Sequence, residues 1–579
     1  MNYLLKDLVR KPLLVFFLLS IVGLIIYAQT FTNEFCSDDL KIIVGNNAVK
    51  DIVNIQEMWR VFNTRFVTGL SFAVNYKIAS LDPFGYHVVN WACHVLAAFL
   101  VYLFVMALSR APGLKNDPHQ DDLPFVALSC ALIFLVHPLQ TQAVNFITQR
   151  CVSMATVFIL ASMIFYMKAR IDKRPLFFIG TFMAMLLGLF SKEMTVVIPL
   201  ALTAFELYWM RQQGTSYKWP KVLIVFYVLS LVVPVTLFFD APGSILEMKA
   251  QIVGRTFSWH YFFTEINVFR TYIRMLLLPL FQSHHYAYPL VEDIFEWPTI
   301  FSVLLLGAVI FYAVKQFNRQ RLLSFAIVLF YLGLIVEALH VCFVNKGVIY
   351  DHWLYFPMVG FSLFASVFIF SCHISRRMKK GILIGVIIFF SMMAFARNRV
   401  WHNCIALWQD VVKKYPDDYL PYVNLGVALS AKGYLDNAIG AYERALDLHD
   451  NQDTKIIAQI MVNLGAAYGK KGDYEKEVEY NLNAIRQDPS NVQAYSNLCL
   501  AYSLLGDNDR ALGYGMKALT VDPDHADAYN NLGVLFGQMG DFQKARDYFQ
   551  AALRLNPDHV QAPGNLQKAL GFMQEDTGE

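Results

Sequence analysis

Long apolar runs alternate with short polar turns over the first two-thirds of this 579-residue chain. About 20 consecutive apolar residues are needed to cross the hydrocarbon core of a bilayer as a helix, and somewhat fewer when charged side chains flank the run. We identify eleven such runs, at residues 12–29, 87–109, 124–138, 150–167, 175–190, 195–210, 221–239, 299–314, 321–341, 353–372 and 380–396. The pattern predicts a polytopic, all-helical membrane region of about eleven spans.

The last third of the chain follows a different pattern, a repeat. An Asn-Leu pair recurs at Asn424, Asn463, Asn497, Asn531 and Asn565, and the last three steps are 34 residues long. A glycine lies nine residues after each of the first four asparagines, and three prolines are also spaced 34 residues apart. A 34-residue period with turn residues at fixed places is typical of the tetratricopeptide repeat, a helix–turn–helix unit. We expect four repeats and a capping helix within residues 415–572.

Composition and charge support this division. Charged residues make up 16% of the chain and hydrophobic residues 56%, whereas soluble domains carry about 25% charged residues. Residues 397–579 hold 17 basic and 24 acidic residues, a net charge of −7, whereas the first 396 have a net charge of +10. With a total of only +3 and no basic block, the chain is not predicted to bind nucleic acid.

Basic residues predict the orientation of the spans, because Lys and Arg accumulate in cytoplasmic loops. Six basic clusters occupy every second loop, whereas the intervening turns carry at most one cation each, at Arg150, Lys192 and Lys346. The N-terminus is therefore expected in the cytoplasm and the acidic repeats on the outer face. The expected organisation is a membrane core over residues 1–396 with outer loops at 30–86 and 240–298, a connecting segment at 397–414, the repeats at 415–572 and a tail at 573–579.

Eight cysteines are present, without a CxxC pair or the His/Cys spacing of a metal site. We interpret them as neither a disulfide framework nor a zinc module. The chain also lacks a Walker A loop and the motifs GxGxxG, HExxH and GxSxG, which argues against an ATPase, a dinucleotide enzyme, a metalloprotease and a serine hydrolase.

The first outer loop contains a pair of acids, Asp38 and Asp39, soon after the first span. Adjacent carboxylates repel each other, so one of them can have a raised pKa, or the pair can hold a divalent cation. Such a carboxylate can take the proton from an attacking hydroxyl group. The alternative is structural, because Ser37, Asp38 and Asp39 before an apolar run are also good residues for capping a helix.

Further polar residues lie where the outer loops meet the bilayer. Ionisable groups at this depth are costly and often functional, and several cations on one face suit a phosphate or diphosphate. The candidates for such a phosphate-binding site and its surroundings are Arg65, His137, Gln149, Arg150, Lys192, Glu193, Arg274, His284, Asp351 and His352. For each residue alone, the alternative is snorkelling to the interface or a local ion pair.

The order of several short motifs resembles the C-type membrane glycosyltransferases, specifically those fused to tetratricopeptide repeats, such as the animal O-mannosyltransferases and shorter bacterial relatives. The matching stretches are Asp38-Asp39, Arg65-Phe-Val-Thr68, residues 81–90 with His87 and Asn90, His94, His137-Pro138, Gln149-Arg150, Ser191-Lys192-Glu193, Tyr272-Ile-Arg274, residues 353–357, Trp401 and Leu407-Trp408. Two stretches differ from the family pattern: the family often has Arg-Pro-Leu-Thr at residues 65–68, and Asp/Glu-Arg at Asp351-His352.

This resemblance implies transfer of a sugar from a polyprenyl-phosphate donor to a protein, onto Ser or Thr, on the non-cytoplasmic side. It implies Asp38 or Asp39 as the base, with five residues near the donor phosphate: Arg65, Arg150, Lys192, Arg274 and His352. Supporting roles would fall to His87, His137, Glu193, His284 and Asp351. No metal is required, although the acid pair could hold a divalent cation, and the repeats would hold an acceptor or partner protein.

Two other functions fit the same pattern. A ligase or polymerase of lipid-linked oligosaccharide would use the Arg and His residues of the late outer loop, which are Arg255, Arg270, Arg274, His284 and His285. A non-enzymatic assembly scaffold would use the spans only as an anchor, but an anchor has no need of buried Arg, Lys and His. The expected location is a bacterial inner membrane with periplasmic repeats, or alternatively the endoplasmic reticulum with the repeats in the lumen.

Overall fold

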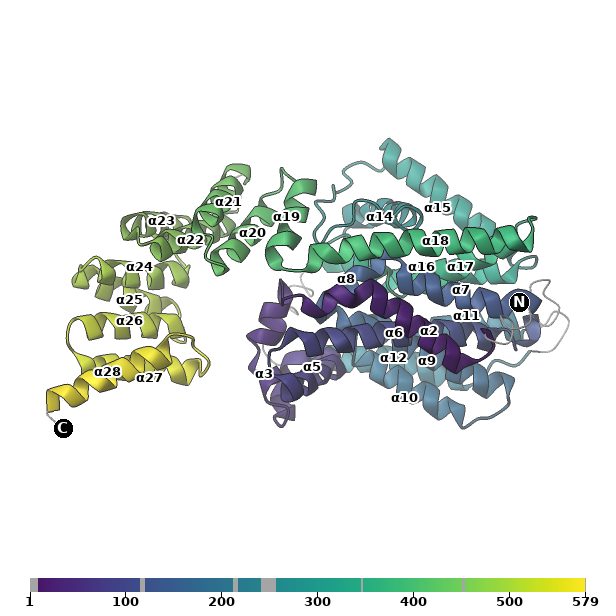
Figure 1. Ribbon diagram of the computed structural model, residues 1–579, viewed down its shortest axis with the longest axis horizontal. Coiled ribbons are helices and arrows are strands. Elements are labelled where there is room, and N and C mark those ends of the chain that lie inside the picture. The colour runs from purple at the N-terminus through teal and green to yellow at the C-terminus, as the bar shows by residue number, and fades with distance from the viewer. Residues whose placement is uncertain are drawn as a thin grey trace. The chain divides into compact units, whose positions relative to one another are not determined.

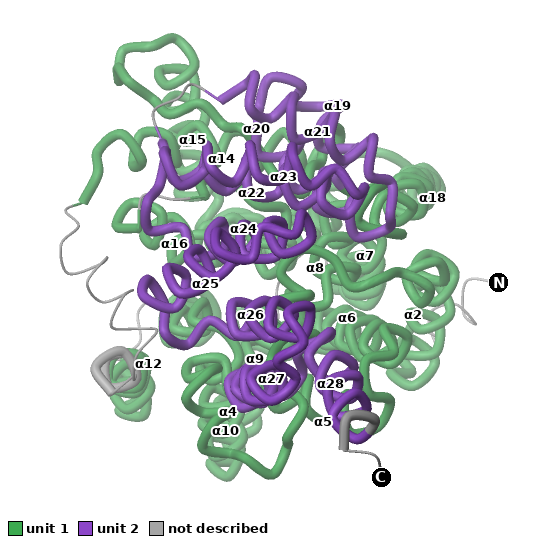
Figure 2. The backbone as a smooth tube through the Cα atoms, turned by 90° about the vertical axis from the view of Figure 1, so that its left-hand side faces the viewer, with its two compact units in different colours: residues 1–407 green, residues 408–579 purple. Residues whose placement is uncertain are grey.

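The computed structural model describes residues 9–114, 120–211, 217–240, 257–344, 347–449 and 453–577. The chain forms two compact units, Met1–Leu407 and Trp408–Glu579 (Figure 2). Within the described ranges every regular element is a helix, as the hydropathy pattern and the repeat predict. The predicted connecting segment, residues 397–414, contains the end of one long helix and helix α19, Cys404–Lys414, in which the first unit ends.

Each of the eleven predicted apolar runs contains a helix (Figure 1). In chain order these are α2 Pro12–Tyr27, α6 Pro83–Leu108, α7 Leu123–Val136, α9 Arg150–Ile171, α10 Phe177–Leu189, α11 Ile198–Phe205, α12 Val222–Asp240, α15 Trp297–Gln316, α16 Arg321–Val344, α17 Pro357–Ser371 and α18 Arg376–Asn398. In the part of the chain that the structure describes, seven helical segments are long and apolar enough to cross a membrane, or eight with one bent pair. The apolar parts of α10, α12 and α17 are shorter. A helix rises only about 1.5 Å per residue, so the shorter apolar helices cannot cross the bilayer by themselves. Full-length spans are therefore fewer than the eleven apolar runs.

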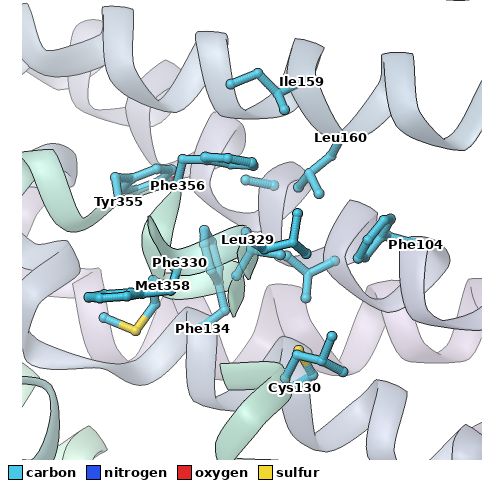
Figure 3. Packing of buried hydrophobic residues seen from close by; sticks show 14 of the residues in the cluster. Phe104, Cys130, Phe134, Ile159, Leu160, Leu329, Phe330, Tyr355, Phe356 and Met358 are labelled. Carbon is cyan, nitrogen blue, oxygen red and sulfur yellow. The ribbon is translucent and has the colours of Figure 1, made fainter. Parts of the chain in front are cut away.

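Apolar packing holds the membrane unit together. Helix α6 packs against both α7 and α9, and α16 packs along α17. Figure 3 shows part of this core, which includes Phe330 of α16 and Met358 of α17, and in which the rings of Phe134 and Tyr355 meet edge to face with their centroids 5.3 Å apart. A core of large, fully buried side chains fixes the helix ends that carry the polar residues.

The third predicted span is interrupted at His137-Pro138. Helix α7 ends at Val136, and the chain bends by 53° into the short helix over Pro138–Asn145. Proline lacks the N–H that would continue the hydrogen-bond ladder, and the His137 ring accepts a hydrogen bond from the Leu139 N–H at 3.3 Å instead. The bend leads the chain to Ile147–Gln149, where α9 begins.

A buried asparagine joins the ends of three apolar segments. The Asn145 carbonyl oxygen accepts hydrogen bonds from Thr30 and Asn33 at 2.8 and 2.9 Å, and its amide nitrogen donates to Asn398 at 2.7 Å. The Asn398 amide in turn donates to the Ile26 carbonyl at 2.8 Å. A buried network of this kind specifies how α2, the bent segment and α18 meet.

One disulfide is present, contrary to the interpretation that the cysteines form no such framework. Cys36 and Cys404 are bonded across 368 residues of sequence, with their Cα atoms 5.3 Å apart. The bond fixes the residue two places before Asp38 to the first residue of α19. Sequence spacing alone cannot reveal a pair so far apart.

Breaking this disulfide should lower the stability of the membrane unit. Replacing Cys36 and Cys404 by serine should cost about 2–4 kcal/mol of unfolding free energy, because the cross-link constrains the unfolded chain. Alkylation of the denatured protein with a polymer-tagged maleimide checks the bond itself. The wild type should show six modified thiols before reduction and eight after it, because the other six cysteines are free. Eight modified thiols without reduction would show that the bond is absent.

The described residues of the second unit form the end of α19, four helix pairs and a final helix. The pairs are α20 Tyr419–Ala431 with α21 Leu435–Leu448, α22 Thr454–Lys471 with α23 Tyr474–Gln487, α24 Val492–Leu504 with α25 Asn508–Val521, and α26 Ala526–Gln538 with α27 Phe542–Leu555, followed by α28 Ala562–Thr577. Gly433, Gly472, Gly506 and Gly540 lie at the turns within the pairs, with φ values of 81–89° that favour glycine.

Three of the helix pairs each contain the same kind of stack, built from two aromatic rings and a cation. Tyr468, Tyr502 and Phe536 each lie parallel to a tyrosine of the second helix, at ring separations of 5.2–5.6 Å. A cation caps each stack: Lys476, Arg510 and Lys544 lie 4.6–5.1 Å from the ring centroids. Each such contact contributes about 0.5–1 kcal/mol at an exposed site, so the 34-residue period carries its own stabilising interaction.

Candidate functional site

The two acids of the loop that follows α2 have different surroundings. Asp39 is 1% exposed, and its carboxylate accepts hydrogen bonds from the N–H groups of Thr148 at 2.8 Å and Cys36 at 3.4 Å. Burial raises the pKa of Asp39 to about 7, although these N–H donors oppose the shift. Asp39 therefore fastens the loop to the N-terminal end of the segment that becomes α9.

Asp38 instead lines a cavity of about 550 Å³. It is exposed, and partial burial raises its pKa while the nearby Lys41 ammonium group lowers it. The cavity walls also include Lys41, Arg60, Arg65 and Gln149, with apolar surface from the segment between α2 and α5 and from α5 itself, Phe66–Ala79. A carboxylate and three cations therefore share a space large enough for a sugar phosphate.

Arg65 and Glu193, distant in sequence, are brought together by two turns. The Thr64 hydroxyl donates to Glu193 at 2.8 Å, and the Arg65 guanidinium lies 3.2 Å from the same carboxylate. Backbone bonds lock the two turns: the Val67 N–H donates to the Phe190 carbonyl at 2.8 Å, and the Thr68 hydroxyl donates to the Ser191 carbonyl at 3.1 Å. Since the Arg65 and Glu193 side chains both remain nearly half exposed, Arg65 can reach an anion in the cavity.

Lys192 lies beside this pair but is engaged elsewhere. Its ammonium group is 2.8 Å from the carboxylate of Glu337 in α16, and both side chains are nearly buried. Breaking a buried pair of this kind by removing one partner costs about 3–5 kcal/mol. Lys192 thus connects the 190–193 turn to α16.

His352, Asp351 and His284 reach the same region from later in the chain. The His352 backbone N–H donates to Gln142 at 2.8 Å, and burial together with the charge of Lys192 holds the pKa of His352 well below its usual range. Asp351 accepts a 2.5 Å hydrogen bond from Tyr286. The His284 ring lies 3.3 Å from the hydroxyl of Ser37, the residue before Asp38. His284 thus contacts the loop of Asp38, and the low pKa of His352 keeps its ring neutral.

Arg150 is fully buried and its donors are occupied. Its guanidinium donates to the side chains of Asn90 and Asn75, both at 2.7 Å, and to the Tyr86 carbonyl at 2.9 Å. It also donates to Ser71 and lies 4.7 Å from the centroid of the Phe72 ring. This geometry favours a role in joining α5, α6 and α9 over the contact with donor phosphate that the sequence suggested.

Three other predicted residues are separate from the cavity walls. His87 and His137 are fully buried and lie 3.2 and 3.0 Å from the carbonyl oxygens of Asn33 and Leu276, respectively, as structural groups do. Arg274 is exposed in the last turn of α14, Trp259–Leu277. Of the late-loop residues that a ligase would use, Arg270 donates to the Pro298 carbonyl at 3.0 Å, and Arg255 lies outside the described residues.

Sequence reasoning missed Lys41 and Arg60. Both line the cavity of Asp38, and Arg60 is also paired with Glu57 at 2.7 Å. The available signal was their position in the same outer loop as the acid pair. Within the ranges that the structure describes, no three His, Cys, Asp or Glu side chains gather as a metal site.

Fold and composition define an integral membrane protein with a tetratricopeptide-repeat unit. Family models described as "Tetratricopeptide repeat" match residues 422–455, 458–491 and 526–559. The crystal structure of MamA is 24% identical and covers 27% of this chain and 89% of its own, with a TM-score of 0.23. The crystal structure of YrrB is 21% identical and covers 31% of this chain and 88% of its own, also with a TM-score of 0.23.

Longer matches reach into the membrane unit. The chain is similar to protein O-mannosyl-transferases of Caenorhabditis elegans (24% identical over 461 residues), Homo sapiens (21% over 513) and Drosophila melanogaster (23% over 527). Each match covers 76% of this chain, and 63%, 67% and 55% of these relatives, respectively. The chain thus spans between about half and two-thirds of their length. The predicted resemblance to glycosyltransferases fused to tetratricopeptide repeats is confirmed.

Proposed function

We propose that this protein transfers a hexose, mannose by similarity, from a polyprenyl-phosphate donor to a Ser or Thr hydroxyl of a protein. The observation that carries the proposal is the cavity in which Asp38 shares the walls with Lys41, Arg60 and Arg65. A base for the acceptor and cations for a leaving phosphate are the two groups that this displacement needs. Relatives named protein O-mannosyl-transferases support the reaction class.

In this mechanism the acceptor oxygen attacks the anomeric carbon in line with the bond to the lipid phosphate. Asp38 takes the hydroxyl proton as the new glycosidic bond forms. The bond to the phosphate oxygen breaks, and the departing polyprenyl phosphate keeps the electron pair. Arg65, with Lys41 and Arg60, stabilises that charge, while Asp39, Lys192 and Arg150 position the segments that carry these groups.

We place the cavity and the repeats on the non-cytoplasmic side. The alternating basic clusters support this orientation, and so does the Cys36–Cys404 bond, because disulfides persist in oxidising compartments. A bacterial inner membrane with periplasmic repeats and an endoplasmic-reticulum membrane with lumenal repeats both satisfy it. In this proposal the repeats hold the acceptor or a partner protein, as α-solenoids do with extended chains.

The test is a transfer assay with the full-length protein in nanodiscs. Polyprenyl-phosphate mannose and a nucleotide-linked mannose are compared as donors to a Ser/Thr-rich acceptor protein, with the glycan mass read by mass spectrometry. Transfer from the lipid-linked donor only is expected. Equal transfer from the nucleotide sugar would contradict the donor assignment. Extension of a lipid-linked oligosaccharide, with no modified protein, would favour the ligase or polymerase instead.

Replacing Lys41 by glutamine should move the acidic limb of the pH–rate profile upward. The Lys41 charge lowers the pKa of Asp38, so its loss raises that pKa. A general base works only when deprotonated, and kcat/KM should therefore need a higher pH to reach its plateau. Lys77→Gln, a change at an exposed lysine of α5, is the control and should leave the limb in place. An unmoved limb in Lys41→Gln would show that another group is the base.

A further inference from the structure

Two apolar cavities lie beside α14 within the membrane unit. The larger, about 850 Å³, is lined by α14, α15 and α16, and the smaller, about 320 Å³, by the same helices and α17. Ile327 and Tyr331 of α16 contribute to both walls. Neither cavity includes Asp38 or the cations of the proposed transfer site.

Two polar atoms in these walls have no hydrogen-bond partner. Glu265 of α14 lines the larger cavity and is 4% exposed, yet its Oε1 atom has no hydrogen-bond partner. The Tyr331 hydroxyl, between the two cavities, is also buried without a partner. An unpaired buried polar group is destabilising, so a ligand that supplies the missing hydrogen bonds would bind favourably.

The surroundings of Glu265 favour its neutral form. No Lys, Arg or His is among the described residues that line the larger cavity. Burial, with a smaller contribution from the charge of Glu337, raises the pKa of Glu265 to about 9. A protonated carboxyl group both donates and accepts a hydrogen bond, whereas an anionic head group would meet no counter-charge there.

The larger cavity opens towards lipid. Ile310 and Val314 of α15 and Leu339 of α16 line it, and all three are exposed apolar side chains. Both helices are candidate membrane spans, and only 17% of the apolar window of α15 is buried within the protein. A ligand can therefore enter sideways from the hydrocarbon of the bilayer.

We infer that the α14–α16 cavity binds a long-chain lipid with an uncharged hydroxyl head group, whose hydroxyl bonds to Glu265 and Tyr331. The chain of such a lipid fills the apolar walls, and its hydroxyl matches the donor and acceptor atoms left unpaired. A lipid phosphate does not fit, because no cation lines the cavity. The site is therefore distinct from the transfer cavity, and the inference does not depend on the proposed activity.

Photo-crosslinking of the full-length protein in phosphatidylcholine nanodiscs tests the head group. Three probes share one sixteen-carbon chain with a diazirine and an alkyne: the alcohol, its phosphate ester and the hydrocarbon without a head group. The alcohol should label peptides of α14–α16, and excess unlabelled hexadecanol should compete. The phosphate ester and the hydrocarbon should each label these peptides at least tenfold less.

Variants link the labelling to the two polar groups. Glu265→Gln can still donate and accept and should keep the labelling, whereas Glu265→Leu and Tyr331→Phe should each lower it several-fold. Ala338→Phe places a large side chain in the larger cavity and should abolish the labelling. This variant keeps the test decisive if Glu265→Leu does not fold. Glu292→Leu, at an exposed loop position, is the matched control and should change nothing.

Two results would overturn the inference. Preferential labelling by the phosphate ester would identify the cavity as a site for phospholipid-like or donor lipids. Equal labelling by all three probes, unchanged in Ala338→Phe, would show bulk bilayer lipid only.

Discussion

Arg150→Ala should abolish folding of the membrane unit rather than weaken donor binding alone. The Arg150 side chain is fully buried, and it donates hydrogen bonds to Asn75, Asn90, Ser71 and the Tyr86 carbonyl. Each hydrogen bond to a charged group is worth about 1.5–3 kcal/mol, and alanine leaves the side-chain oxygens of Asn75 and Asn90 without this donor. A loss of more than about 4 kcal/mol is expected, which is a large part of the stability of an ordinary domain.

The measurement is the yield of monodisperse protein together with its thermal unfolding in detergent. Arg65→Ala is the matched control, because it removes the same group from an exposed ion pair, worth at most about 1 kcal/mol. Arg150→Lys should be intermediate, since a lysine keeps the charge but cannot reach acceptors in several directions. If Arg150→Ala folds like the wild type and fails only to bind donor, the phosphate contact suggested by the sequence is correct.

The architecture could be predicted almost entirely from periodic features of the sequence. Each apolar run became a helix because a backbone in lipid must satisfy its own hydrogen bonds. The 34-residue period predicted the helix pairs, since glycines such as Gly506 take the positive φ that the turn needs. The length of each span was less predictable: α17 begins only at Pro357, because a 3₁₀ turn over Asp351–Leu354 takes up the start of the predicted run.

The candidate site could be predicted only in part. Arg65 lines the same cavity as Asp38 and pairs with Glu193, whereas Lys192 pairs with Glu337 of α16. Which charge pairs with which depends on helix packing. That packing buries Arg150, whose guanidinium donates to the side chains of Asn75 and Asn90. The sequence shows that an ionisable group lies at membrane depth, but it does not show whether that group faces a cavity or the protein interior.

Long-range pairs were the least accessible to sequence reasoning. The bond between Cys36 and Cys404 and the asparagine network around Asn145 join segments more than 100 residues apart. No local pattern marks such residues, because their neighbours in sequence are apolar or ordinary turn residues. Lys41 and Arg60 were missed for a related reason: a lysine or arginine in a loop is usually solvated, and only the fold turns these two towards Asp38.

Asp38→Asn should lower the rate of sugar transfer by about 10²–10⁴-fold while leaving the protein folded. The asparagine keeps the shape of the side chain but cannot accept the proton of the acceptor hydroxyl, and general-base catalysis typically contributes this factor. Because Asp38 is exposed in the cavity, the substitution should change the unfolding free energy by less than about 0.5 kcal/mol. Donor binding should persist, since Arg60 and Arg65 are intact.

Two neighbouring substitutions separate catalysis from structure. Asp39→Ala removes the carboxylate that holds the Thr148 N–H, so it should cost about 1–3 kcal/mol of stability and reduce transfer by misplacing the loop. Asp51→Asn, at an exposed position of the same loop, should change neither. The readouts are kcat and KM for transfer, donor photo-crosslinking and thermal unfolding for all variants. Full activity in Asp38→Asn, with loss of turnover but normal folding in Asp39→Asn, would assign the base to Asp39. Its pKa of about 7 would then set the acidic limb of the pH–rate profile.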